Sequence, residues 1–300
     1  MRIVIAVDPS NPCGWIAAAL GHFPLADPLD IVVVSALGMR PPPLTSPGPV
    51  ARRLYGAAIA ALHAEARQAA MGAVETVREG LAARAAQVAV RISDRAPAQA
   101  IVQAAVWWSA DIILTGPSGA GRVRRSLLGS VPDDVVRAAP CPVLVSRRQV
   151  GELQRVLVAT DGSLHAEAAL RFLVGLPLPA SAQVRVSAVS ETLGHGWTAV
   201  LRARREKPEP GGLLAGGERR AASRAIARAQ EMLTGLRCSV QSSLRVGEAA
   251  RELADEVQGW LPDLVVLGAR GRTAGPDVAL GSVAEALLRA TPCPTLVVRG

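Results

Sequence analysis

The chain has 300 residues, about twice the length of a common single domain, so two domains with separate cores are the first expectation. Half of the residues are hydrophobic and 19% are charged, a balance that excludes disordered, collagen-like and coiled-coil proteins. Apolar runs such as 31–34 and 264–267 end far short of the roughly 18 residues that span a bilayer, which argues against a membrane protein.

The N-terminus and the charge balance bear on location and partners. Residues 2–7 predict a strand and lack the basic and long apolar segments of a secretory signal, so we expect a cytoplasmic protein. The formal net charge is +8, but the arginines that dominate it are scattered, and aromatic residues make up only 3% of the chain. Binding of nucleic acid is therefore not expected, and a GC-rich genome is the simpler explanation of the arginine content.

Four cysteines occur, Cys13, Cys141, Cys238 and Cys293. No two have the C-x-x-C spacing, and none has a histidine at zinc-ligand spacing, so neither a metal site nor a redox motif is expected. In a cytoplasmic protein we expect all four to be reduced thiols.

The two halves of the sequence repeat each other. The stretch 112–119 (IILTGPSG) resembles 264–271 (LVVLGARG), and 139–145 (APCPVLV) resembles 291–297 (TPCPTLV). Gly116 and Gly268 lie 152 residues apart, and so do Cys141 and Cys293. The opening stretches 3–8 (IVIAVD) and 156–161 (VLVATD) align at a spacing of 153. The chain therefore carries two copies of one domain, which we place at 1–149 and 150–300.

The first copy alternates strands and helices. Apolar runs predict strands at 3–7, 31–35, 88–92, 112–114 and 143–145. Helices are predicted at 12–21, 52–84, 97–108 and 130–138, and the proline-rich segment 39–50 is predicted to be a loop. The helical face of 52–84 is formed by apolar residues three or four positions apart: Tyr55, Ile59, Leu62, Ala66, Ala69, Ala73, Val77 and Leu81.

The second copy follows the same order. Its strands are predicted at 156–159, 184–189, 239–244, 264–267 and 295–298, and its long helix presents Ile226, Ala229, Leu233 and Leu236 on one face. The segment 191–217 is predicted to be a mobile loop. The fold class is therefore α/β: two tandem copies of an open, doubly wound, five-stranded parallel sheet of the Rossmann-like kind, with ligands expected at the carboxyl ends of the strands.

A glycine motif follows the fourth strand of each copy: Gly-x-x-Gly, nine residues, then Gly-Ser. It consists of Gly116, Gly119, Gly129 and Ser130 in the first copy and of Gly268, Gly271, Gly281 and Ser282 in the second. Glycines let backbone amides approach an anion, and Gly-Ser opens a helix whose amide groups carry partial positive charge. Glycine and serine also punctuate ordinary loops and cap helices, but the same spacing in both copies favours a phosphate site. Nearby arginines add charge: Arg122, Arg124, Arg125, Arg270 and Arg272.

An aspartate ends the first strand of each copy, Asp8 in the first and Asp161 in the second. At that sheet edge a carboxylate can accept hydrogen bonds from a ribose or an adenine, or help to hold Mg²⁺. It can equally form an Asx turn or cap the next helix, and the two roles are compatible.

Together the strand ending in Asp, the glycine motif and the closing Pro-Cys-Pro strand resemble the universal stress protein family in its tandem two-domain form. The resemblance covers nearly the whole chain and implies an adenine nucleotide alpha hydrolase-like fold that binds ATP, with its phosphates on the glycine loop and its adenosine near the first-strand aspartate. It assigns Asp8, Gly116, Gly119, Gly129 and Ser130 to one site, and Asp161, Gly268, Gly271, Gly281 and Ser282 to the other. It also implies that the two domains pack as an intramolecular pseudo-dimer, with a further homodimer as an option.

The first copy departs from the family pattern at two positions. Pro9 follows Asp8, and Pro117 follows Gly116. Each proline removes a backbone donor and stiffens its loop, so occupancy is expected at the second site more than at the first.

No catalytic residue is predicted. The P-loop, nucleophile-elbow and metalloprotease motifs are absent, and the lone lysine, Lys207, lies in the segment 191–217. His165 is interpreted as a helix-surface residue, with contact to a bound nucleotide as the alternative. We expect a nucleotide-binding regulatory protein of the stress response, with slow or no hydrolysis and an unknown protein partner. The alternatives are a Mg²⁺-dependent adenine-nucleotide hydrolase or phosphotransferase that uses Asp161, and, more weakly, a nucleic-acid binder whose affinity falls steeply with salt.

Overall fold

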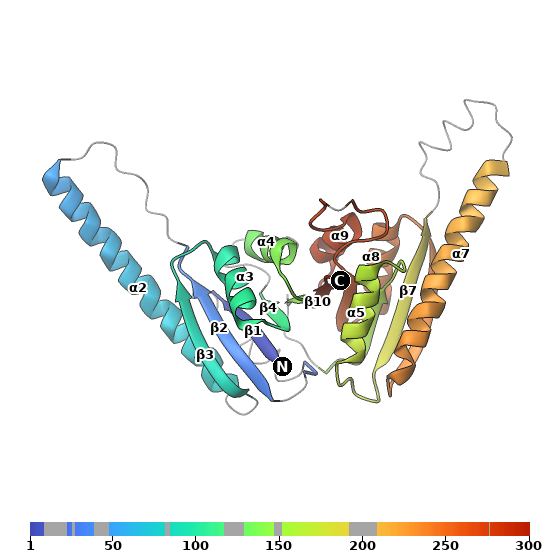
Figure 1. Ribbon diagram of the computed structural model, residues 1–300, viewed down its shortest axis with the longest axis horizontal. Coiled ribbons are helices and arrows are strands. Elements are labelled where there is room, and N and C mark those ends of the chain that lie inside the picture. The colour runs from blue at the N-terminus through green and yellow to red at the C-terminus, as the bar shows by residue number, and fades with distance from the viewer. Residues whose placement is uncertain are drawn as a thin grey trace. The chain divides into compact units, whose positions relative to one another are not determined.

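The computed structural model describes residues 1–8, 23–25, 28–38, 48–81, 85–116, 129–146, 152–191, 209–275 and 277–300. The chain divides into two compact units, Met1–Val150 and Gly151–Gly300, and each is an α/β structure built from parallel strands and helices (Figure 1).

The described part of the N-terminal unit contains five parallel strands in the order β3-β2-β1-β4-β5. They are β1 (Arg2–Val7), β2 (Leu29–Ala36), β3 (Ala85–Ser93), β4 (Ile112–Thr115) and β5 (Val143–Val145). Its described helices are α2 (Pro49–Leu81), α3 (Pro97–Trp108) and α4 (Ser130–Ala138). Proline occupies the first position of both α2 and α3, where a missing amide hydrogen costs no helical hydrogen bond.

The C-terminal unit repeats this order as β8-β7-β6-β9-β10, again with parallel pairs. Its strands are β6 (Arg155–Ala159), β7 (Gln183–Glu191), β8 (Ser239–Gly247), β9 (Leu264–Gly268) and β10 (Thr295–Val298). Its described helices are α5 (Leu164–Val174), α7 (Glu209–Met232) with the 3-10 turn Leu233–Gly235, α8 (Ala249–Trp260) and α9 (Ser282–Ala290). Helices α5 and α7 pack together as one layer and α8 and α9 as another, and right-handed crossovers place the two layers on opposite faces of the sheet.

The strands form the core of each unit because helices cover both faces of the sheet. Residues Ile3–Ile5 and Ile112–Ile113 are completely buried in the N-terminal unit, as are Val156–Val158 and Leu264–Val266 in the C-terminal unit. This burial on both faces explains the uninterrupted apolar runs in the sequence. The α/β class with a doubly wound parallel sheet is therefore confirmed.

Several predicted elements are confirmed at their predicted bounds, among them the helices at 97–108 and 130–138. The loop prediction for 191–217 is wrong at both ends, because β7 continues to Glu191 and α7 begins at Glu209. The predicted loop 39–50 is likewise too long, since α2 begins at Pro49. The predicted helix at 12–21 lies outside the described residues.

The predicted apolar face of the first long helix is wrong over most of its length. Leu62 is 49% exposed and Ala69 is also exposed, whereas the fully buried side chains are Ala70, Val74 and Val77. Among the described side chains of this helix, full burial is confined to its C-terminal part, so its earlier apolar residues are not core residues.

Candidate functional site

The glycine motif and the aspartate of the C-terminal unit meet where β6 and β9 lie side by side. These two neighbouring strands lead into connections that run toward opposite edges of the sheet, which makes this point the topological switch of the unit. Asp161 follows the end of β6, Gly268 ends β9, and Gly281 immediately precedes α9. The fold therefore brings together residues that lie more than a hundred positions apart in the sequence.

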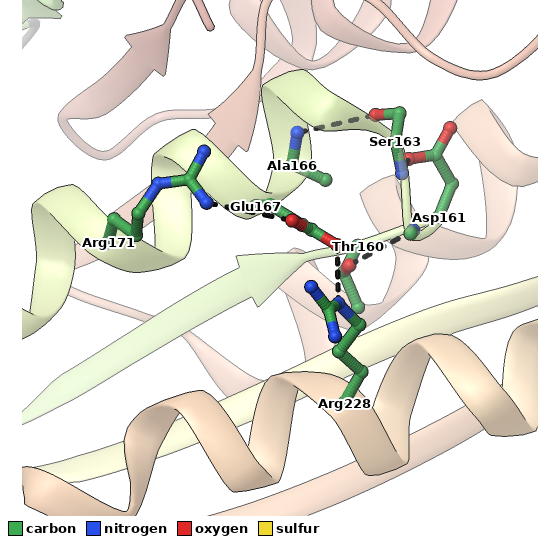
Figure 2. Close-up of polar contacts among 8 residues, drawn as sticks. Thr160, Asp161, Ser163, Ala166, Glu167, Arg171 and Arg228 are labelled. Carbon is green, nitrogen blue, oxygen red and sulfur yellow. Dashed lines mark hydrogen bonds and ion pairs between the residues drawn. The ribbon is translucent and has the colours of Figure 1, made fainter.

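A polar turn joins β6 to α5 (Figure 2). Oδ1 of Asp161 accepts a hydrogen bond from the backbone N–H of Ser163 at 2.9 Å, which is an Asx turn. The hydroxyl of Ser163 accepts one from the N–H of Ala166 at 3.3 Å and so caps α5. The Asx turn predicted as one role of Asp161 is thus present, whereas the residue that caps α5 is Ser163.

Helix α5 is tied to its neighbour α7 by charge. Glu167 in the first turn of α5 accepts a hydrogen bond from Arg228 of α7 and lies 3.6 Å from Arg171 (Figure 2). The hydrogen bond from Arg228 is the main cause that lowers the pKa of Glu167. Its carboxylate at the helix N-terminus also faces the positive end of the helix dipole.

Asp161 also holds the glycine loop. Its Oδ2 accepts a hydrogen bond from the backbone N–H of Arg272 at 2.8 Å, and the Ser163 hydroxyl donates to the carbonyl of Arg270 at 3.2 Å. A Cβ at Gly271 would lie 2.8 Å from Oδ2 of Asp161, so a side chain there would push the carboxylate away from the loop. Asp161 therefore joins the end of β6 to the loop after β9 through its hydrogen bonds.

Gly268 allows another close contact, between the end of β9 and the first turn of α5. A Cβ at this position would lie 2.6 Å from the carbonyl carbon of His165 and 2.7 Å from the backbone nitrogen of Ala166. The first turn of α5 thus packs directly on the backbone at the end of β9. The close contacts of Gly268 and Gly271 are with this chain itself, and they fix the shape of the loop.

The N-terminus of α9 provides backbone donors. Gly281 is the N-cap, with φ −73° and ψ 155°, and it offers no side chain to cap the helix. The first helical hydrogen bond joins the N–H of Glu285 to the carbonyl of Gly281. The amides of residues 282–284 precede that bond, so they have no acceptor within the helix. All three residues line the cavity described below.

His165 lies beneath the loop and not on the surface, so the helix-surface prediction is wrong. It is 9% exposed, with Nε2 at 2.9 Å from Nε of Arg270 and Nδ1 at 2.8 Å from the backbone nitrogen of Gly300. Burial lowers the pKa of His165, and the charges of Arg270 and Arg299 lower it further against the opposing effect of Asp161. A neutral imidazole has one acceptor nitrogen, so only one of the two contacts is a hydrogen bond at a time.

A cavity of about 390 Å³ opens at this edge of the sheet, within the size range of small-ligand sites. The glycine loop and the start of α9 line one part of it, which we call the loop end. Residues of β6, β7 and α8 line another part, the aliphatic end, and β7 lies on the opposite side of β6 from β9. The lining residues at that second end are Ala159, Val189, Glu191, Ala249 and Leu253.

Two arginines give the loop end of the cavity positive charge. Arg270 and Arg272 both line it, and each is also engaged with its own chain. Arg270 approaches His165, while the guanidinium of Arg272 forms an ion pair with Glu218 of α7 at 3.1 Å. Both members of that ion pair are close to half exposed, so the pair is weak.

The N-terminal unit places most of its predicted site residues at matching points. Asp8 follows β1, Gly116 follows β4, and Gly129 is the N-cap of α4 with φ −68° and ψ 157°. Ser130 is the first residue of that helix, and β1 pairs directly with β4. Gly119 and the three arginines at 122, 124 and 125 lie outside the described residues.

No motif in the sequence predicted the part of the cavity that β7 and α8 line. Val189, Glu191, Ala249 and Leu253 occur in ordinary strand and helix patterns, and the predicted topology alone placed the second strand beside the first. Ser163 and His165 had a usable signal, because both closely follow Asp161 in the sequence.

The described residues contain no cluster of three or more His, Cys, Asp or Glu side chains suited to a metal ion. Burial, and to a lesser extent the charge of Asp111, raises the pKa of Cys141 to about 12, so this cysteine is a thiol at neutral pH. Among the described helices, none combines the length and apolar character needed to cross a bilayer.

Comparison with known proteins gives one family. The model of the universal stress protein family matches residues 1–147 and again 152–299. A universal stress protein of Mycobacterium tuberculosis is 30% identical over 78% of this chain and 77% of its own length. One of Synechocystis is 25% identical over 63% of this chain, and the match spans 58% of that relative, less than two thirds of it.

Solved structures show the same fold. A universal stress protein of Archaeoglobus fulgidus matches 99% of this chain and 96% of its own with a TM-score of 0.62 at 20% identity. One from Pseudomonas aeruginosa, described as a putative universal stress protein, matches 99% of this chain and 92% of its own with a TM-score of 0.57 at 17% identity.

Proposed function

The chain belongs to the universal stress protein family, and on that premise we propose that it is a nucleotide-regulated stress-response protein whose C-terminal domain binds ATP. The observation that carries the proposal is the cavity between β6, β9 and α9, where a glycine loop, two arginines and a helix N-terminus share one wall. Occupancy by the nucleotide would bias the conformation or the partners of the protein.

The cavity fits the two ends of a nucleotide. Phosphates suit the loop end, where the amides of residues 282–284 and the guanidinium groups of Arg270 and Arg272 supply donors and positive charge. A base suits the aliphatic end beside Val189 and Leu253. Asp161 keeps the loop in place between the two ends through its hydrogen bond to the amide of Arg272.

Slow or absent hydrolysis is part of the proposal. The alternative hydrolase would use Asp161 with Mg²⁺, but both oxygens of Asp161 already accept backbone hydrogen bonds. Each oxygen keeps a further lone pair, so a cation bound through phosphate can still approach. The arrangement favours binding over turnover, and no specific observation favours the hydrolase.

The test is a calorimetric titration of nucleotide-free protein with Mg-ATP, comparing the wild type with Gly281→Asp. The backbone of Gly281 has N-cap geometry, and a Cβ there would meet its nearest atom at 3.4 Å, so aspartate is compatible with the fold. Its carboxylate would occupy the anion position at the start of α9. Loss of one or two charged hydrogen bonds predicts a roughly ten- to hundredfold weaker Kd.

Two matched variants complete the experiment. Gly275→Asp adds the same charge at a glycine whose Cβ would meet no atom within 4 Å and which does not line the cavity, so its Kd should stay within about twofold of the wild type. Gly129→Asp makes the equivalent change in the N-terminal domain and reports whether that domain contributes a second site. Absence of any ATP binding by the wild type would refute the proposal.

The remaining expectations stay predictions. These are ATP binding by Asp8, Gly116, Gly119, Gly129 and Ser130, the pairing of the two domains as an intramolecular pseudo-dimer, the further homodimer, and the cytoplasmic location. Analytical ultracentrifugation of the full chain with and without Mg-ATP addresses the oligomeric state.

A further inference from the structure

Glu191 is the last residue of β7, and its side chain lines the same cavity as the glycine loop. It sits at the aliphatic end, on the strand that also contributes Val189. The backbone of Glu191 is held in register with Gly247 of β8, so regular sheet structure fixes the point from which its exposed side chain extends.

The opposite charges that line the cavity come from strands on either side of β6. Arg270 and Arg272 follow β9 and line the loop end beside the positive N-terminus of α9, whereas Glu191 ends β7, on the other side of β6. An ionised carboxylate in a site for a polyanion raises the electrostatic cost of binding. An ionised carboxylate only accepts hydrogen bonds, so it cannot donate one to a phosphate oxygen. In a nucleotide site, the carboxylate of Glu191 can instead recognise hydrogen-bond donors on the nucleoside part of the ligand.

A nucleoside offers two kinds of donor at that end: the hydroxyls of the ribose and the exocyclic amino group of the base. Both are recognised by the same chemistry, a charged acceptor. Resting on the proposed function, we propose that Glu191 is a specificity-determining residue of the C-terminal site, which selects nucleotides by accepting a hydrogen bond from a nucleoside hydroxyl or amino donor.

The test is a set of calorimetric titrations with four nucleotides: ATP, 2′-deoxy-ATP, 3′-deoxy-ATP and inosine triphosphate, which lacks the amino group. In the wild type we expect ATP to bind about tenfold tighter than whichever analogue lacks the recognised donor. In Glu191→Ala that ratio should fall to about one, while the affinity for the analogue stays equal or rises. The analogue affected identifies the ribose or the base as the source of the donor.

Two further variants separate recognition from bulk electrostatics. Glu191→Gln removes the charge but keeps a carbonyl acceptor, so it should retain part of the discrimination. Glu248→Gln removes a nearby exposed carboxylate that does not line the cavity and that, although Glu248 is the N-cap of α8, makes no capping hydrogen bond, so it should leave the ratio unchanged. If the wild type binds ATP and Glu191→Ala keeps the full wild-type ratios, or no ratio exists to lose, this inference fails and the proposed function stands. If the wild type binds no ATP, both fail.

Discussion

The N-terminal and C-terminal units share their strand order, yet they differ in the contact just below the strand ends. In the C-terminal unit, Ser187 of β7 and Glu256 of α8 are both buried, and the serine hydroxyl donates a hydrogen bond to the carboxylate. Strand pairing and the repeat spacing put Val34 and Ala104 at the matching positions of the N-terminal unit, and both are buried and apolar. One architecture thus accepts either a polar or an apolar pair at this level.

The buried polar pair of the C-terminal unit lies close to its cavity. Ser187 lies two residues before Val189, which lines the cavity. Nη1 of Arg185 lies 3.8 Å from the carboxylate of Glu256, and the guanidinium of Arg185 lies 4.2 Å from the ring centroid of Trp260. A buried polar network lowers stability unless each of its groups has a hydrogen-bond partner. We therefore expect such a network where it supports a binding site. The glycine loops also differ, because Ser118 and Ala120 occupy the sequence positions that match Arg270 and Arg272, while the arginines of the first loop lie further along, at 122, 124 and 125.

The largest expected effect comes from closing the gap at Gly268. Gly268→Ala places a Cβ 2.6 Å from the backbone of His165, where only a shift of α5 relieves the overlap, so we expect a loss of about 3 kcal/mol in the free energy of unfolding of the C-terminal unit. Urea unfolding followed by circular dichroism measures it. Gly235→Ala, whose Cβ would meet no atom within 4 Å, is the matched control. Equal stability of the two variants would contradict the packing role of Gly268.

Exchanging the buried pair between units tests the comparison directly. Ser187→Val leaves the carboxylate of Glu256 without its hydroxyl donor and should cost about 2 kcal/mol. Adding Glu256→Ala recreates the apolar pair of the N-terminal unit, so the double variant should be more stable than the sum of the single changes by about 1 kcal/mol. Strictly additive unfolding free energies would show that the pair is not coupled.

Lowering the pH should destabilise the C-terminal unit through His165. Because the pKa of His165 is lowered in the folded protein, the unfolded chain takes up its proton first, near pH 6.5. Stability from this residue is complete above that pH and is lost as the pH falls below it, at no more than about 1.4 kcal/mol per pH unit. Urea midpoints between pH 7.5 and 5.5 measure the slope. The same slope in His165→Gln would exclude this residue as its source.

The smallest effect concerns the ion pair between Arg272 and Glu218. Glu218→Gln removes a half-exposed pair, so we expect a change in unfolding free energy of about 0.5 kcal/mol or less, vanishing at high salt. Because Arg272 no longer pairs with residue 218, the variant is expected to bind Mg-ATP at least as tightly as the wild type does. Weaker ATP binding in this variant would mean that α7 helps to position the loop.

The sequence predicted the parts of the fold that depend on local pattern. Buried strands are runs of Val, Ile and Leu, and α3 starts at a proline, so both were found near their true bounds. The buried face of α2 was not predicted correctly, because alanines recur on every side of that helix. Periodicity also cannot show where along the helix the sheet ends.

The site divides in the same way. Asp161, Gly268, Gly271, Gly281 and Ser282 were predicted from their positions after strands and from the glycine motif, and all five line one cavity, while their binding of a nucleotide stays a prediction. Glu191 and Leu253 belong to elements that the chain reaches only through the sheet topology, so nothing in their local sequence marks them. The burial of His165 depends on Gly268 allowing α5 to approach, which is a tertiary effect.

The length of α2 has a consequence for local motion. Its 33 residues span about 50 Å, whereas β2, with eight residues, spans about 26 Å, so the helix extends well past the sheet that it covers (Figure 1). Val50 and Leu54 are 72% and 68% exposed, and Ala70 is the first fully buried side chain. The segment from Pro49 to Ala69 therefore depends mainly on its own helical propensity, and its amide hydrogens should exchange with solvent through local fraying, long before those of residues 70–77, which open only with the unit itself.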